Sequence, residues 1–155
     1  MEIGKVEFLN VPKVITKHTW EKTWKTLWLV ETVKPNYKLA EDMFVTLSLT
    51  DGTEKLIRVK EGYECDLASI PSLLWSKWLP DSIELEAILH DILYQTEVFS
   101  REECDAVLEA AMVARDKPAA VTKMFGTAVR TFGWLVWREH TAESIEASME
   151  YLEVT

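Results

Sequence analysis

The two sides of Gly62 follow different hydrophobic periodicities, and this change limits the folds open to the chain. Before it, short runs rich in β-branched and aromatic residues are typical of strands. After it, longer segments repeat apolar residues at helical spacing. This order predicts an α+β fold, with N-terminal antiparallel strands and a hairpin followed by a bundle of three or more helices.

Residues 1–61 are expected to be mainly β. Strands are predicted at residues 6–9, 26–30, 44–49 and 56–59. Asp51-Gly52 is a turn dipeptide between the last two, which makes them the clearest hairpin in the sequence. The spacing of Trp20, Trp24 and Trp28 also suits a helix, but the β-branched residues between them favour a strand.

Residues 62–140 are expected to be mainly α. The pattern predicts a short helix or turn at 71–78 and long helices at 83–96, 101–115 and 119–140. Ser100 and Glu103 form a capping box that begins the second long helix. Gly126 and Gly133 lie on one side of the third, where small residues permit close packing against a neighbouring helix.

The acidic tail, residues 141–155, repeats apolar residues at helical spacing and is expected to form an amphipathic helix or an arm for a neighbouring subunit. We find no linker, repeat or low-complexity tract. A chain of 155 residues buries roughly two-thirds of its unfolded surface on folding, so a single domain spanning 1–155 is expected.

Charge and targeting signals exclude several classes of protein. The formal net charge of −9 opposes binding to nucleic acid, which depends on Lys and Arg. The N-terminus lacks the pattern of a signal peptide, and no stretch approaches the ~20 apolar residues of a membrane span. Cys65 and Cys104 are too few for a disulfide scaffold, so buried free thiols are favoured over a bridge between them.

Tryptophan is unusually frequent, with 7 residues in three clusters. The clusters are Trp20, Trp24 and Trp28, then Trp75 and Trp78, then Trp134 and Trp137. Large amphipathic rings favour core packing first and a partner surface second.

His90-Asp91 places a base beside a carboxylate within the first long helix. Ala87, His90 and Tyr94 share one side of this helix, and an apolar stripe occupies the other: Leu85, Ile88, Leu89 and Ile92. The polar side should therefore face something other than the main core.

Three blocks in order, at 62–71, 90–94 and 101–105, have the pattern Gly-aromatic-x-x-Asp-x-Ala-Ser-Ile-Pro, His-Asp-x-Leu-Tyr and Arg-x-x-x-Asp. They resemble a family of unknown function common in tailed bacteriophages and prophages. The resemblance spans roughly residues 62–133 and departs at Leu67 and Cys104, where the family more often has small residues. It implies a phage protein, made in the host cytoplasm and destined for the virion or an accessory role, with other phage structural proteins or copies of itself as partners.

One interpretation of these blocks is a buried polar network. The charged candidates are Asp66, His90, Asp91 and Asp105, which need partners if they are buried. Arg101, one turn before Asp105, can pair with it. Ser69 can cap its turn or donate to a carboxylate, and Tyr94 can donate to Asp66.

The other interpretation is a hydrolytic site, because the His-Asp helix also resembles that of phospholipases A2. This resemblance implies His90 as general base, Asp91 as calcium ligand, Asp105 as the carboxylate that orients the imidazole, and 62–69 as the metal loop. Asp66 would add a metal ligand, and Tyr94 and Ser69 further catalytic contacts, with host-envelope lipid as substrate. The chain departs from those enzymes in having a single loop glycine and no disulfides between helices.

Two further enzyme classes fit less well. The phosphohydrolases named for a His-Asp pair need an upstream helical histidine, but only His18 precedes, in a predicted strand or loop. Ser69 lacks the glycine-flanked turn that exposes a nucleophilic serine. His140, at the end of the third helix, is expected to complement the helix dipole. A structural module of the phage tail or neck and a hydrolase acting on the host envelope therefore remain open.

Overall fold

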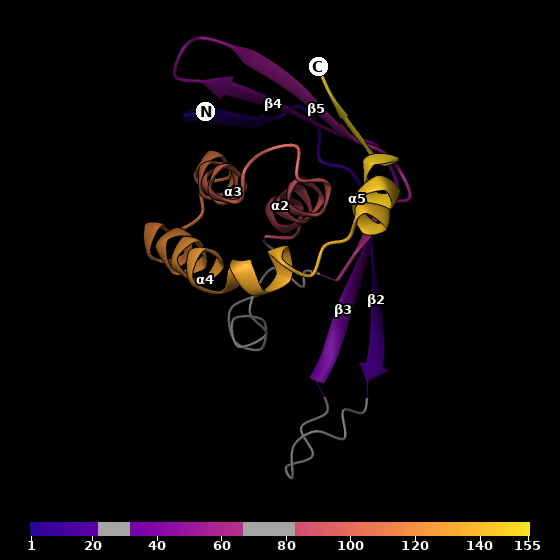
Figure 1. Cartoon of the computed structure of the whole chain (residues 1–155). Helices are drawn as coiled ribbons and strands as arrows, with labels where there is room; N and C mark the ends of the chain where they lie inside the picture. Colours follow the sequence, from indigo (N-terminus) through magenta and orange to yellow (C-terminus); the bar gives the residue numbers. More distant parts are fainter. Residues whose placement is uncertain (22–31, 67–82) are drawn as a thin grey trace.

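The structure is a computed structural model and describes residues 1–21, 32–66 and 83–155. It places antiparallel strands before helices, so the expected α+β class is confirmed (Figure 1). The expected strand at 26–30 and the short helix or turn at 71–78 lie outside the described residues, as do Ser69 and four of the tryptophans.

The described strands are β1 (Ile3–Phe8), β2 (Val14–Glu21), β3 (Thr32–Leu39), β4 (Met43–Leu49), β5 (Glu54–Val59), β6 (Glu64–Cys65) and β7 (Leu152–Val154). The described helices are α2 (Glu84–Thr96), α3 (Arg101–Ala114), α4 (Ala119–Trp137) and α5 (Ala142–Met149). The three long helices therefore lie within three residues of their expected ends.

The strands form two antiparallel sheets. The larger has the order β1-β4-β5-β7 and the smaller β2-β3-β6. The expected hairpin is confirmed, since β4 and β5 pair from Met43 opposite Val59 to Ser48 opposite Glu54. Its turn contains Gly52 at φ 85°, in the left-handed region that favours glycine.

The tail differs from the expectation. Helix α5 forms, but the chain then turns into β7, which pairs with β5 of the same chain. Leu152 lies opposite Val59 and is only 6% exposed. These residues complete their own sheet, so an arm for a neighbouring subunit was wrong for this segment. The helical spacing misled because Leu152 fills the core from a strand.

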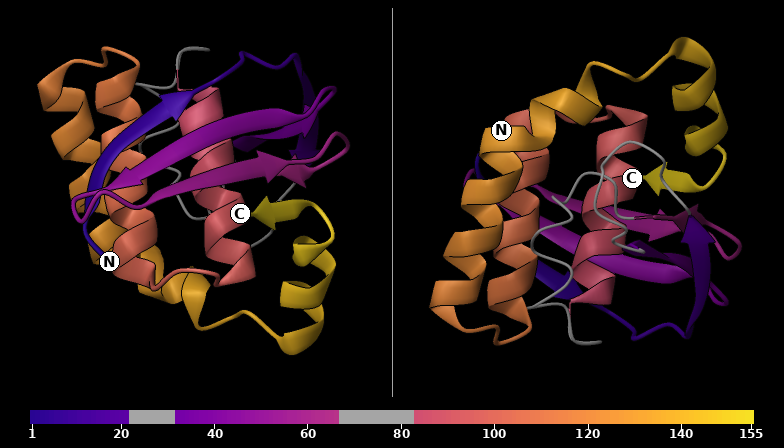
Figure 2. Two further views of the ribbon diagram at one scale, coloured as in Figure 1. Left: turned by 90° about the horizontal axis from the view of Figure 1, so that it is seen from above. Right: turned by 90° about the horizontal axis from the view of Figure 1, so that it is seen from below.

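Helix α2 lies at the centre of the molecule. The larger sheet covers α2 and α3, α5 lies beside α2, and α4 lies on the side away from the sheet (Figures 1 and 2). The expected apolar stripe is buried, but so is the opposite side, because α3 and α4 cover it. A helix enclosed on all sides gives rigid positions to its polar residues.

Candidate functional site

His90 and Asp105 form a buried pair that joins the two central helices. Nε2 of His90, in the middle of α2, lies 3.1 Å from Oδ1 of Asp105, in the first half of α3. The two side chains are 0% and 1% exposed, respectively. Because both groups are removed from solvent, their polar atoms need partners within the protein, and each supplies one to the other.

Arg101 extends this pair to the protein surface. It lies one turn before Asp105, and its Nη1 is 3.4 Å from the second carboxylate oxygen, Oδ2. The same guanidinium donates to the backbone carbonyl of Arg130 at 3.3 Å and to Glu102 at 3.0 Å. The expected capping box at Ser100 is confirmed, and it fixes the start of the helix just before Arg101. One cation thus neutralises the buried carboxylate and connects α3 to α4.

Tyr94 lies beside His90 and faces α4. The two ring centroids are 4.7 Å apart, and the ring of Trp137 packs against Tyr94 in an edge contact at 4.8 Å. Burial raises the pKa of Tyr94, and the nearby charge of Asp105 raises it further, so the phenol stays protonated. Its hydroxyl lies against Gly133 and near the guanidinium of Arg101, and it forms no hydrogen bond to Asp66. The expected donation to Asp66 was therefore wrong.

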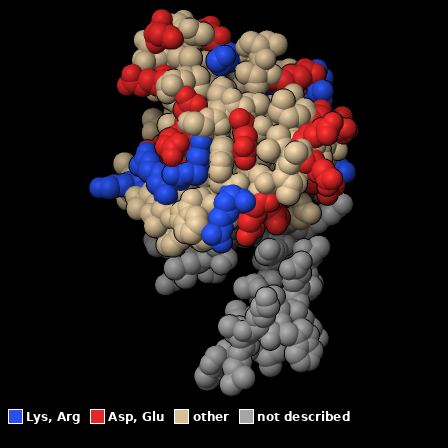
Figure 3. Space-filling view, in the orientation of Figure 1, with Lys and Arg blue, Asp and Glu red and all other residues tan. Residues whose placement is uncertain are grey.

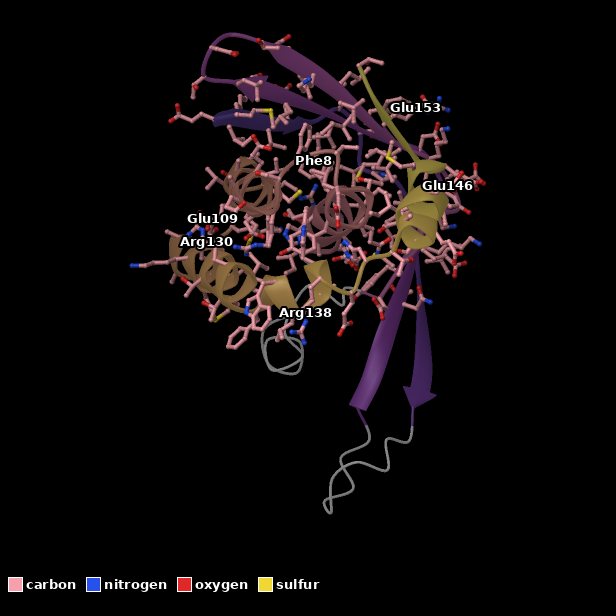
Figure 4. The ribbon with its side chains drawn as sticks, viewed as in Figure 1. Phe8, Glu109, Arg130, Arg138, Glu146 and Glu153 are labelled. Carbon is pink, nitrogen blue, oxygen red and sulfur yellow. The ribbon has the colours of Figure 1, made fainter. Side chains whose placement is uncertain are left out.

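The two glycines of α4 allow its neighbours to approach closely, as expected. A side chain at Gly133 would occupy the position of the Tyr94 hydroxyl, and one at Gly126 would occupy that of the Glu109 carboxylate. Glu109 in turn lies 2.6 Å from the guanidinium of Arg130, across α3 and α4 (Figure 4). The glycine spacing therefore marked where α4 packs.

Asp91 belongs to a second neighbourhood, on the β6 side of α2. It is 2% exposed, and the nearby Tyr63 is 3% exposed and donates to Gln95 at 3.2 Å. Burial raises the pKa of Tyr63 well above its usual value, and the charges of Cys65, Asp91 and Asp66 raise it further. Among these contacts, His90 faces Asp105 and Asp91 lies on the Tyr63 side of α2, and the expected convergence of all four charged groups on one centre stays a prediction.

The described residues contain no group of three or more His, Cys, Asp or Glu side chains placed to hold a metal ion. Asp66 and Asp91 both lie near Tyr63, whereas Asp105 pairs with His90. Most of the expected metal loop, including Ser69, lies outside the described residues.

Two buried residues, Glu86 and Tyr63, and the partly buried Trp137 escaped the sequence analysis. Glu86 is fully buried in α2 and lies 3.0 Å from Arg115 and 3.4 Å from Lys117. An acidic residue between apolar neighbours on a central helix was the signal that marked it. Tyr63 was noted only as the aromatic position of a motif, and Trp137 only as one of many tryptophans.

Other expectations had mixed outcomes. Cys65 and Cys104 are both buried and form no disulfide, as favoured. Trp137 packs against the core, as expected first, whereas Trp134 is 49% exposed, and a partner surface there stays a prediction. His140 lies just beyond the end of α4, where its backbone N–H donates to the carbonyl of Trp137 at 3.3 Å and its Nδ1 is 2.9 Å from Glu97. Its expected interaction with the helix dipole stays a prediction.

A family model with the description "Protein of unknown function (DUF1353)" matches residues 38–129, more than half of the chain. The chain belongs to the DUF1353 family. The matched range contains His90, Asp91, Arg101 and Asp105 but ends before Gly133. No curated protein and no solved structure matches this DUF1353 chain. None of its described helices is both long and apolar enough to span a bilayer.

Proposed function

We propose that this DUF1353 protein is a virion-associated or accessory protein of a tailed phage, acting as an interaction module of the tail or neck. In this proposal the Asp/His centre is structural. The observation behind it is the complete burial of the His90–Asp105 pair, together with its neutralisation by Arg101. The proposed phage origin rests on the resemblance carried by the three sequence blocks at 62–71, 90–94 and 101–105.

A structural role accounts for the geometry of the pair. A general base must come within hydrogen-bond reach of its substrate, but His90 has no exposed surface. One groove among the described residues lies between β1 and α3, away from His90. A buried hydrogen-bonded pair between two helices favours the helix register in which both partners are satisfied, and this is the role that we propose for His90 and Asp105.

The surface supports an interaction role. Helix α4 exposes Phe132 (51%), Trp134 (49%) and Leu135 (38%), and large apolar side chains exposed on one helix favour a protein partner. Arg138 covers one face of Trp134, at 4.8 Å from the ring centre. Acidic side chains gather on the side of α5, where Glu143, Glu146 and Glu150 are exposed (Figure 3).

The proposal is tested with His90→Ala and a control of matched stability loss. Leu152→Ala removes core volume far from the pair. If the centre is structural, the two variants should lose stability and incorporation into purified phage particles in parallel, measured by urea unfolding and mass spectrometry of the particles. The structural proposal would be contradicted by a His90→Ala protein that folds and enters particles normally but has lost an enzymatic activity that the wild-type protein shows.

The second candidate is a His-Asp hydrolase acting on the host envelope, dependent on calcium. One observation favours this candidate. A single ring nitrogen of His90, Nε2, contacts the carboxylate of Asp105, and a carboxylate in this position can orient a histidine that acts as general base. This candidate expects release of fatty acid from phospholipid vesicles with calcium, abolished in His90→Gln at unchanged stability. Absence of that release from the wild-type protein would exclude it.

A further inference from the structure

We infer that the exposed face of α4 binds the outer face of α5 in a second copy of this chain, so that copies associate head to tail. The α4 face is formed by Lys123, Arg130, Trp134 and Arg138, and the α5 face by Glu143, Glu146 and Glu150. Helix α4 packs on α3 and helix α5 on α2, so the two faces lie on different sides of the molecule (Figures 1 and 2). A contact between two different surfaces joins copies in a ring or an open chain.

The α4 face carries positive charge in an acidic protein. Helix α4 contains Lys123 and Arg130 and no acidic residue, and Arg138 follows directly, whereas the whole chain has a net charge of −9. Lys123, Arg130, Trp134 and Arg138 follow one another at intervals of seven, four and four residues. At this spacing they lie along one side of the helix. All four are exposed, so the α4 face is a cationic stripe that includes one aromatic ring.

This charge is only partly neutralised within the molecule. Arg130 pairs with Glu109, but Lys123 and Arg138 form no ion pair in the described part of the chain. Arg138 lies over the ring of Trp134, which is still 49% exposed. A partner that supplies carboxylates and covers this ring would satisfy both features.

The α5 face has the opposite charge. Glu143, Glu146 and Glu150 recur at intervals of three and four residues, so they lie on one side of the helix. All three are exposed, and none forms an ion pair among the residues that the structure describes. Met149, three residues after Glu146, is 43% exposed and offers an apolar contact to an aromatic ring. Figure 4 shows Glu146 of this face and Arg130 of the α4 face at opposite sides of the view.

The two faces also match in length. At about 1.5 Å per residue, Arg130 and Arg138 are about 12 Å apart along α4, and Glu143 and Glu150 about 10 Å apart along α5. Two helices lying side by side can therefore join two cations to two glutamates. Exposed ion pairs contribute little each, so the burial of Trp134 must supply part of the affinity. Helix α5 keeps its contacts with α2, and only its outer face meets the second copy.

The inference rests on the proposed interaction role, because it names the partner of the α4 face. The two can nevertheless fail separately. A protein that stays monomeric but enters phage particles would overturn self-association and leave the proposed function standing. A protein that associates head to tail but is absent from particles would do the reverse.

The test exchanges charge between the two faces. The wild-type protein is examined by sedimentation velocity up to about 100 µM, where association of micromolar strength is largely complete, and it should form species larger than a dimer. Lys123→Glu/Arg138→Glu makes the α4 face acidic, and Glu146→Lys/Glu150→Lys makes the α5 face basic. Each variant alone brings like charges together, so its association should weaken by about tenfold or more. In an equimolar mixture both contacts again join opposite charges, so association should recover.

Lys5→Glu/Lys13→Glu is the matched control, because it changes the net charge as the α4 variant does. Lys5 is 67% exposed in β1, and Lys13 is exposed just before β2. This control should associate as the wild type does, and circular dichroism should show every variant folded.

Several results would overturn the inference. They are a wild-type protein that stays monomeric or stops at a dimer, variants that associate normally, and a mixture that does not recover. Vesicles of phosphatidylglycerol test a membrane as the other partner of a cationic, aromatic helix. A protein that stays monomeric and binds these vesicles, with binding lost in Lys123→Glu/Arg138→Glu, would also overturn it.

Discussion

At the residue scale, the strongest expectation concerns Asp105. Replacing it with alanine leaves His90 buried without its acceptor and removes the carboxylate that faces Arg101. Breaking one side of a buried pair is typically destabilising by about 3–5 kcal/mol. Asp105→Ala should therefore lower the free energy of unfolding by about that amount, measured by urea denaturation.

Glu102→Ala provides the control for this loss. Glu102 also pairs with Arg101, at 3.0 Å, but its side chain is 73% exposed. An exposed pair contributes about 1 kcal/mol or less, so this variant should unfold almost as the wild type does. If Asp105→Ala and Glu102→Ala lose equal amounts of unfolding free energy, the burial of Asp105 is not the cause of its contribution to stability.

Glu86 leads to a prediction on pH. Burial raises the pKa of its carboxyl above the usual value for glutamate, although Arg115 and Lys117 act in the opposite direction. The native state therefore holds this proton more tightly than the unfolded state does. The resulting stabilisation is complete below the unfolded pKa and is lost as pH rises through the native pKa.

Glu86→Gln keeps the shape of the protonated side chain without the charge. It should raise the free energy of unfolding at about pH 7 and change it little at about pH 4, measured by urea denaturation at both values. The exposed Glu102→Gln is the control and should show no such difference. A Glu86→Gln protein that is less stable than the wild type at neutral pH would contradict the assigned direction.

At the element scale, the packing of α4 predicts different outcomes for its two glycines. Gly133→Ala places a methyl group where the hydroxyl of the rigid, buried Tyr94 lies, and overpacking of this kind costs about 1–3 kcal/mol. Gly126→Ala meets the end of the flexible Glu109 side chain, which can move. It should stay within about 1 kcal/mol of the wild type, because alanine also favours the helix.

The melting temperature of Tyr94→Phe/Gly133→Ala tests this explanation. Removing the hydroxyl makes room for the new methyl group, so the double variant should recover most of the stability that Gly133→Ala loses. If Tyr94→Phe gives no recovery, the close contact is not the cause of the loss.

Elements were predictable where local pattern and tertiary role agree. Asp51-Gly52 and the capping box at Ser100 act over a few residues, so they located a hairpin and a helix start from sequence alone. Strand β7 was missed because its conformation is set by pairing with β5, which is about 95 residues earlier in the chain.

In the candidate site, too, contacts within one element were predictable and contacts between elements were not. Arg101 and Asp105 are neighbours on one helix, so their spacing reveals the contact. His90 and Asp105 meet only because the turn after Thr96 makes α2 and α3 pack side by side. The separation of Asp91 from His90 follows from the rotation of about 100° between successive helical residues, which directs the two side chains to different neighbours.

At the scale of the whole molecule, the core is continuous from the sheet to the helices. One cluster of buried side chains includes residues of β1, β4, β5 and β7 together with α2, α3 and α4. The expected single domain therefore predicts one cooperative unfolding transition. The C-terminal strand is the most informative place to test this, because it joins the sheet last along the chain.

Leu152→Ala removes buried volume from β7 and should lower the free energy of unfolding by about 2–3 kcal/mol. In one cooperative unit, the loss spreads to distant helices, so circular dichroism of the helices and tryptophan fluorescence should shift to the same lower urea midpoint. Glu153→Ala, next in the strand, removes only exposed ion pairs to Arg58 and Lys60 and should shift both signals little. If the helical signal of Leu152→Ala keeps its wild-type midpoint while other signals move, the sheet and the helices unfold separately, and the single-domain prediction is wrong.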